Sequence, residues 1–159
     1  VEACPYKMIA FNPVTATGEK CIGCFPRVEA GIAPACHRQC PGRTRAYGYL
    51  DDEKGQVFQL VTKWKVALPL HPEYGTQPNV YYVPPLSPFA YDEAGNLTET
   101  PRIPGEVLER YFGPEVHRAL ATLRAERAKR ERKEPSELMD LLISRIWRDR
   151  FGGFTRDPV

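Results

Sequence analysis

The sequence predicts an α+β protein with three zones, which are a small cysteine-rich domain at residues 1–50, an extended arm at 51–104 and a helical extension at 105–159. Three observations support this division. All five cysteines lie in the first zone, prolines and tyrosines crowd the second, and the third carries apolar residues at helical spacing. A chain of 159 residues has room for one domain, or for a small domain with an extension.

The composition argues against several classes of protein. A formal net charge of +2 gives no general attraction to polyanions, so no nucleic-acid partner is expected. No run of about 18 to 20 apolar residues is present, so no direct membrane span is expected. The opening letters, VEACPYK, do not resemble a signal peptide and lack an initiator Met. We therefore expect the natural chain to have further residues upstream.

The first zone is predicted to consist of loops with two short strands, in the letters KMIAF and RAYGYL. Its apolar runs are too short to build a sizeable core. Something other than a large hydrophobic core must therefore hold this zone together.

The second zone begins with a turn, DDEKGQ, and continues into the letters HPEYGTQPNVYYVPPLSP. Proline cannot donate to a sheet ladder, so we interpret this stretch as an extended arm that lies on another surface. Its large aromatic residues are expected to anchor the arm against a partner subunit rather than to relay electrons: Trp64, Tyr74, Tyr81 and Tyr82. His71 and Glu73 are treated as structural, since no nucleophile or third partner accompanies them.

The third zone is predicted to form three helices, over residues 105–112, 113–133 and 135–152. Pro114 and Pro135 suit first-turn positions, and Ser136 is a candidate cap. The last helix would end at the glycines 152 and 153.

Apolar residues mark the packed faces of the two longer helices. They are Val116, Leu120 and Leu123 in the middle helix, and Leu138, Leu141, Leu142, Ile146 and Trp147 in the last. The charged letters RAERAKRERK should form a solvated or partner-facing end.

Four cysteines lie within one short segment and a fifth precedes them: Cys21, Cys24, Cys36 and Cys40, with Cys4 upstream. An odd number fits a disulfide framework poorly. Both cysteines of a Cys-x2-Cys pair can bind one metal, because the backbone between the two cysteines can curl so that its amides point at the sulfurs. Zinc and iron–sulfur clusters both use such pairs. A proline follows both Cys4 and Cys40, which is typical of ferredoxin-type motifs and is not required by zinc, so iron–sulfur chemistry is favoured and zinc stays open.

The residues around the cysteines are interpreted as their environment. His37 is a spare ligand candidate, but with Arg38 it is expected to supply a polar or cationic surrounding that tunes the reduction potential. Arg27, Arg43 and Arg45 are expected to form ion pairs at a subunit surface.

Three stretches carry a family resemblance: VEACPYKMIAFNP, EKCIGCFPRVEAGIAPACHRQCPGR and KWKVALPLHPEYGTQPNVYYVPPLSP. Together they resemble the iron–sulfur, or beta, subunits of type II dimethyl sulfoxide reductase family molybdoenzymes. That family includes nitrate, selenate, chlorate and perchlorate reductases, dimethyl sulfide dehydrogenase and ethylbenzene dehydrogenase. The resemblance covers most of the chain and fades after about Tyr91. It implies two ferredoxin-like halves with four cysteine motifs, of which this chain would be an incomplete, C-terminal part.

The resemblance also implies a ligand role for each cysteine. Cys21, Cys24 and Cys36 would hold one [4Fe–4S] cluster, completed by a cysteine from a motif outside this chain. Cys40 would complete the cluster of that outside motif, and Cys4 would complete a third cluster. The implied cofactors are [4Fe–4S] clusters, and the presence of one [3Fe–4S] cluster in the longer subunit stays open.

The implied function is electron transfer between a molybdopterin-containing catalytic subunit and a haem b or membrane-anchor subunit, with no catalysis by this chain. The implied location is the periplasm, within an exported complex, or alternatively the cytoplasmic face of the membrane. Two other classes stay open. One is a zinc-stapled interaction module on residues 21–40. The other is a thiol redox enzyme that uses Cys21 and Cys24, although this pair lacks the βαβ context expected of thioredoxin-like motifs.

Overall fold

The computed structural model describes residues 1–157, so the last two residues of the expected helical extension lie outside the described residues. Its α-helices are α1 (Phe25–Glu29), α2 (Ala35–Arg38), α3 (Gln56–Phe58), α4 (Gly105–Phe112), α5 (Glu115–Glu131) and α6 (Glu137–Leu142). Short helices of other pitch are η1 (Gln59–Lys63), η2 (Pro72–Tyr74) and η3 (Trp147–Phe151). The strands are β1 (Ala10–Asn12), β2 (Thr17–Glu19), β3 (Phe89–Tyr91) and β4 (Leu97–Pro101). This mixture fits the predicted α+β class.

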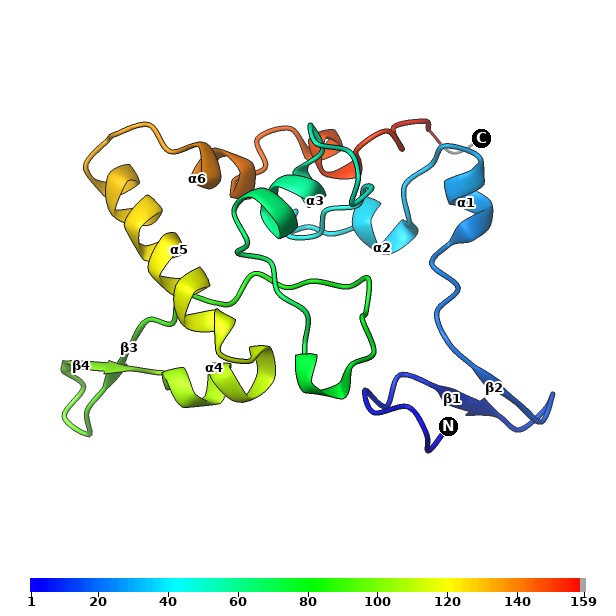
Figure 1. The fold of residues 1–159 in the computed structure, drawn as a ribbon, viewed down its shortest axis with the longest axis horizontal. Helices are drawn as coiled ribbons and strands as arrows, with labels where there is room; N and C mark the ends of the chain where they lie inside the picture. The colour runs from blue at the N-terminus through cyan, green and yellow to red at the C-terminus, as the bar shows by residue number, and fades with distance from the viewer. Residues whose placement is uncertain (158–159) are drawn as a thin grey trace.

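The strands form two separate antiparallel hairpins, β1 with β2 and β3 with β4 (Figure 1). The predicted strand KMIAF is confirmed in its last two residues, which begin β1. The predicted strand RAYGYL is wrong, because residues 45–50 form no strand and are held instead by a backbone hydrogen bond to η3. The backbone amide of Tyr47 donates to the carbonyl of Arg150 at 2.7 Å, which fixes the segment without a strand partner.

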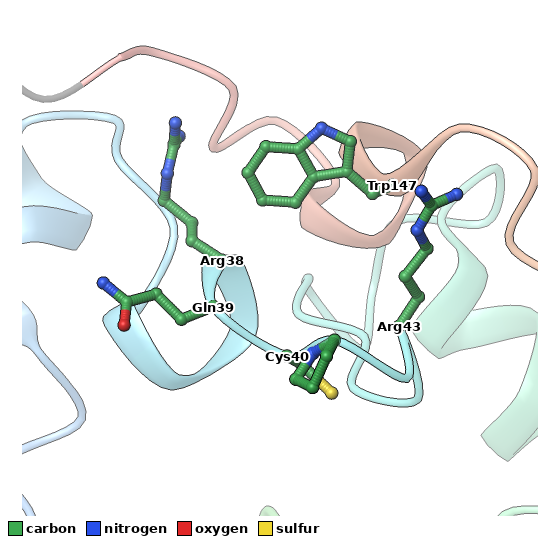
Figure 2. A pocket seen from close by; sticks show the side chains of 6 residues that line it. Arg38, Gln39, Cys40, Arg43 and Trp147 are labelled. Carbon is green, nitrogen blue, oxygen red and sulfur yellow. The ribbon is translucent and has the colours of Figure 1, made fainter.

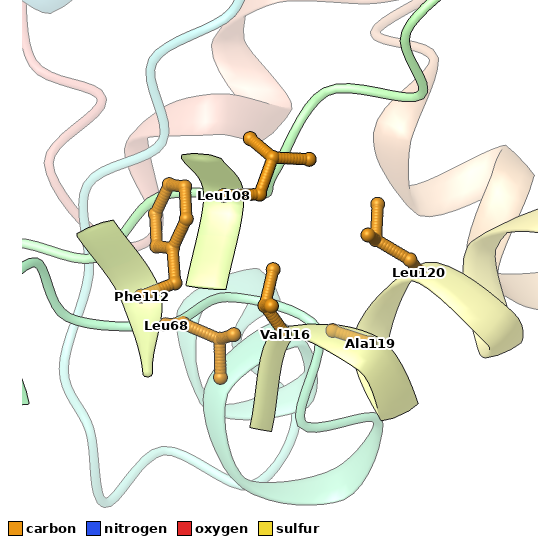
Figure 3. Close-up of a cluster of buried hydrophobic side chains, with 6 residues drawn as sticks. All are labelled: Leu68, Leu108, Phe112, Val116, Ala119 and Leu120. Atoms are coloured by element: carbon orange, nitrogen blue, oxygen red, sulfur yellow. The ribbon is translucent and has the colours of Figure 1, made fainter. Parts of the chain in front are cut away.

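The first hydrophobic core lies between α4 and α5. The predicted apolar positions Val116, Leu120 and Leu123 are all buried, and Gly113 at φ +72° allows the sharp turn between the two helices. Figure 3 shows the cluster that this turn creates, in which side chains of both helices meet one residue of the preceding zone: Leu68, Leu108, Phe112, Val116, Ala119 and Leu120. Leu68 therefore anchors the arm to the surface of these helices.

A second core joins the arm to α5 and α6. Its buried residues are Leu60, Val66, Ala67, Leu123 and Leu138. Trp64 and Tyr81 pack against it, so part of the surface that these aromatic residues contact belongs to this chain itself. Tyr74 and Tyr82 are both 45% exposed and keep the aromatic surface that a partner could cover.

The last predicted helix is interrupted. Ser136 caps α6 as expected, since its side chain accepts a hydrogen bond from the Met139 amide at 3.2 Å. The helix ends at Leu142, because the next residue is extended, and a separate 3-10 helix, η3, follows with Gly152 at its end. As a result Ile146 is 61% exposed and the prediction that it packs is wrong. Pro135 precedes the cap instead of lying in the first turn.

No helix among the described residues is long and apolar enough to cross a membrane. The charged end of α5 is largely solvated, as predicted, with one exception. Glu126 is only 6% exposed, and its carboxylate accepts from Lys129 Nζ and, at 2.7 Å, from the buried Ser136 hydroxyl. The loop between α5 and α6 is thus fixed by one polar cluster.

Replacing Ser136 with alanine should lower the free energy of unfolding by about 2 kcal/mol, since it removes the cap and one of the hydrogen bonds to the buried Glu126 carboxylate. Urea denaturation followed by circular dichroism would measure the change. Thr122→Ala is the control, because its hydroxyl only donates to a carbonyl of its own helix and its loss should cost less than about 0.5 kcal/mol. Equal losses in the two variants would contradict this account.

Glu126 should also give the protein a specific sensitivity to acid. Hydrogen bonds from Lys129 and then Ser136 hold the pKa of its carboxyl below the ordinary value. Its stabilising contribution is therefore complete above the ordinary carboxyl pKa and is lost as the pH falls through the lowered pKa. Unfolding free energies measured between neutral and acidic pH should fall less steeply for Glu126→Gln than for the unmodified protein, whereas Glu131→Gln, an exposed neighbour, should retain the original slope.

Candidate functional site

The Cys-x2-Cys turn has the backbone that metal-binding pairs use. Gly23 and Cys24 both have a positive φ, at 68° and 55°, and the Gly23 amide donates to Cys21 Sγ at 3.4 Å. Cys24 then forms the N-cap of α1, where its carbonyl accepts from Arg27 and Val28. The expected curl of amides toward sulfur is confirmed at Cys21.

Cys36 and Cys40 lie on and just after α2. Cys36 is exposed, and its sulfur lies 3.3 Å from His37 Nδ1. The Cys40 sulfur lies 3.5 Å from the Thr44 hydroxyl, and hydrogen bonding by Thr44 lowers the pKa of the Cys40 thiol to about 7. A substantial share of Cys40 is therefore thiolate at neutral pH, which is the form that binds metal.

Cys4 is held by the turn at the start of the chain. The Lys7 amide donates to its carbonyl at 3.1 Å, and hydrogen bonding from the Met8 amide lowers the pKa of its thiol. The neighbouring Tyr6 hydroxyl lies 3.2 Å from the Leu70 carbonyl and 2.6 Å from Thr76 Oγ1. The Cys4 segment is thus tied to the middle of the arm, at Leu70 and Thr76.

The side chains available at this site are of the chemical type that binds iron–sulfur clusters. All five cysteines are free thiols, and thiolates are the ligands that such clusters use. Within residues 1–157, no three or more His, Cys, Asp or Glu side chains lie close enough together to hold a metal ion. A [4Fe–4S] cluster takes a set of four cysteines, so two clusters need more than the five cysteines of this chain.

Within this chain, Arg27, Arg43 and Arg45 bond to backbone carbonyls, and their pairing at a subunit surface stays a prediction. Arg27 donates to the Ala33 carbonyl, Arg45 to the Cys36 carbonyl and Arg43 to two carbonyls beyond α6. Burial lowers the pKa of His37, so this ring is neutral at neutral pH and the positive charge here comes from arginine.

The C-terminal segment lies directly against the cysteine loop (Figure 1). Ile32 and Thr155 form an antiparallel bridge, the Ala33 amide donates to the Phe154 carbonyl at 3.1 Å, and the Arg156 amide donates to the Gly31 carbonyl at 3.1 Å. A third core fills the space between them, with Ala33, Phe151 and Phe154 buried and Val28, Tyr47 and Trp147 packed around them. The missing large core of the first zone is thus supplied by the end of the chain.

Arg38 connects this segment to the helix that carries Cys36. Its side chain is 11% exposed, pairs with Asp157 at 2.9 Å and lies over the ring of Trp147 at 5.4 Å. Arg148 also pairs with Asp157, and these two arginines hold the pKa of that carboxyl below its ordinary value.

A shallow hollow of about 300 Å³ lies beside Cys40. Figure 2 shows the side chains of Arg38 and Arg43 on either side of the Trp147 ring, while the Cys40 sulfur points away from that ring. Both guanidinium groups already donate to carbonyls or to Asp157. The hollow therefore presents neither the Cys40 thiolate nor an uncommitted cation to a ligand.

Sequence reasoning missed the contribution of the chain end, including Arg150, Phe154 and Asp157. The only sequence signal for this contribution is the mixture of charged and aromatic residues in the letters IWRDRFGGF. Such a pattern gives no sign of the distant segment that it covers.

Comparisons with known proteins identify relatives of this chain. Residues 1–50 match the family model described as a 4Fe-4S dicluster domain. Over 96% of its length the chain is 56% identical to the selenate reductase subunit beta of Thauera selenatis and 56% identical to the chlorate reductase subunit beta of Ideonella dechloratans. It is 50% identical, over 91% of its length, to the perchlorate reductase subunit beta of Dechloromonas aromatica.

The chain spans less than half the length of these relatives, at 47%, 47% and 44%. The relatives therefore have a large region that has no counterpart in residues 1–159.

Phe154→Ala should lower the free energy of unfolding by about 3 to 5 kcal/mol, because it empties the third core. The Phe154 ring is 6% exposed and contacts Tyr47 edge-on at 5.0 Å. Chemical denaturation would measure the loss, with Phe11→Ala as the control, since Phe11 is 59% exposed and its truncation should change the unfolding free energy by less than about 0.5 kcal/mol. A near-neutral result at Phe154 would show that the chain end does not support this region.

Proposed function

Since the chain belongs to the family of iron–sulfur beta subunits that includes those of selenate, chlorate and perchlorate reductases, we propose that it relays electrons between a molybdopterin-containing catalytic subunit and a haem b or membrane-anchor subunit. The observation that carries this proposal is the match of residues 1–50, which contain all five cysteines, to a 4Fe-4S dicluster domain. The chain itself makes and breaks no bond in the substrate of the complex.

The cysteines would bind the irons of [4Fe–4S] clusters, which supply one-electron chemistry when bound. Cys21, Cys24 and Cys36 would hold one cluster, Cys40 would contribute to a second and Cys4 to a third. The structure supports these roles through the amide directed at Cys21 and through the lowered thiol pKa at Cys40 and Cys4. The shortage of thiols agrees with clusters that are shared with cysteines outside this chain.

The proposed location is the periplasm, as part of an exported complex, with the cytoplasmic face of the membrane as the alternative. This part of the proposal rests on the resemblance alone. Fractionation of cells that make the complex, with immunodetection of this chain, would decide between the two compartments.

Serine variants of the five cysteines test both the cofactor and its ligand sets. In the assembled complex, purified anaerobically, Cys21→Ser, Cys24→Ser and Cys36→Ser should abolish or shift the same electron paramagnetic resonance signal. Cys40→Ser should alter a second signal and Cys4→Ser a third. The reason is that each set of ligands belongs to one cluster, and serine oxygen is a poorer ligand for iron than thiolate.

A zinc-stapled module gives a different outcome. Stoichiometric zinc without iron, a colourless protein, equal damage from the four variants between residues 21 and 40, and no effect of Cys4→Ser would overturn the electron-transfer proposal. Thr15→Ser serves as the control for a mild change in an exposed turn of the same zone and should leave every signal unchanged.

A further inference from the structure

Residues 1–20 have few non-covalent connections to the rest of the chain. They contribute no residue to the three hydrophobic cores, and the hairpin of β1 and β2 lies at the edge of the molecule (Figure 1). Within residues 1–157, the hydrogen bonds and ion pairs of this stretch stay inside it, with one exception. The Tyr6 hydroxyl donates to the Leu70 carbonyl at 3.2 Å and lies 2.6 Å from Thr76 Oγ1. One side chain therefore makes the polar connection to the arm.

A tight turn holds Tyr6 close to Cys4. The Lys7 amide donates to the Cys4 carbonyl at 3.1 Å, which closes a turn whose two central residues are Pro5 and Tyr6. Proline at the first central position restricts φ and favours this turn before any other contact forms. Because only Pro5 separates the two residues, fixing the Tyr6 ring also restricts the position of the Cys4 thiol.

The part of the arm that receives Tyr6 is a preformed turn at residues 70–76. His71 has a φ of +50°, and the Tyr74 amide donates to its carbonyl at 3.0 Å. The His71 ring stacks on the Tyr74 ring at 4.7 Å with 13° between their planes, and its Nδ1 lies 2.8 Å from Glu73 Oε1. The Tyr6 ring meets the Tyr74 ring edge-on at 5.9 Å. Tyr6 thus has an aromatic partner and two polar partners on one turn.

The same turn is attached to the first hydrophobic core. Leu70, whose carbonyl accepts from Tyr6, packs against that core. The His71 amide donates to the Tyr111 carbonyl in α4 at 2.7 Å, and the two rings meet edge-on at 5.6 Å. A continuous set of contacts therefore runs from the buried helices through the turn at residues 70–76 to Tyr6.

We propose that Tyr6 is a positioning residue, which docks on the turn at residues 70–76 and thereby holds the Cys4 thiol in place for its cluster. This inference rests on the proposed electron-transfer function. The groups behind a metal ligand fix its orientation and tune the properties of the metal. An exposed stretch without a core of its own needs such a connection, because ordering a mobile ligand costs conformational entropy.

Two variants remove this connection from its opposite sides. Tyr6→Phe keeps the ring and removes the hydroxyl, whereas Thr76→Val removes one of the two partners of that hydroxyl, far from Cys4 in the sequence. In the assembled complex, each should shift or broaden the electron paramagnetic resonance signal that Cys4→Ser alters. The signals that Cys21→Ser and Cys40→Ser alter should stay unchanged. The double variant should match Tyr6→Phe alone, because both substitutions remove the same bond.

Hydrogen–deuterium exchange of the same proteins measures the connection without reference to a cluster. The Lys7 amide, which closes the turn around Tyr6, should exchange about three- to tenfold faster in Tyr6→Phe, a ratio that corresponds to the loss of a hydrogen bond. Tyr91→Phe is the matched control, since it makes the same chemical change on a side chain that is 63% exposed. It should change neither the exchange rate nor any cluster signal.

Three results would overturn the role of Tyr6 while leaving the electron-transfer function intact. They are an unchanged exchange rate at Lys7, equal shifts of all three cluster signals, and additive effects in the double variant. A signal dependent on Cys4 that both single variants leave unaltered would do the same. Absence of any cluster signal in the unmodified complex would instead overturn the proposed function, and the exchange rates would still decide whether Tyr6 holds this segment.

Discussion

The packing of residues 147–157 against the cysteine loop is the interaction on which the candidate site depends. Residues 1–50 contain two small hairpin strands and two short helices, and they bury almost no apolar side chain of their own. Ala33 is the fully buried member that they contribute to a core, and its partners Phe151 and Phe154 come from the other end of the chain. Backbone pairing of residues 31–33 with residues 154–156 then fixes the position of α2 and its cysteine.

The arm and the helices pack together in a second part of the structure, which contains two apolar cores. Its two cores meet along α5, which presents Leu120 to one and Leu123 to the other. Within the arm, β3 and β4 pair only with each other, and apolar residues such as Tyr81 and Val83 pack against the second core. What this leaves exposed, including Tyr74, Tyr82 and Phe89, is a set of large side chains suited to an interface.

Local patterns in the sequence predicted the parts of the structure that depend on local physics. The positions of Val116, Leu120 and Leu123, the cap at Ser136 and the turn at Cys21 all follow from spacing or from one residue's side chain. The interruption after Leu142 and the irregular backbone near Tyr47 do not, because both result from hydrogen bonds between segments about a hundred residues apart. Such bonds leave no periodic pattern in the sequence. For the same reason, the burial of Arg150 could not be predicted, because the sequence around it resembles a solvated helix end.

A ligand shortage and a weak core have a common physical explanation. When a cluster is bound by cysteines from separate segments, the free energy of metal binding also contributes to folding, as in other small metal-stabilised domains. If the cysteine zone shares its clusters with other motifs, as proposed, it needs only enough packing to orient its thiols, and the chain end provides that packing.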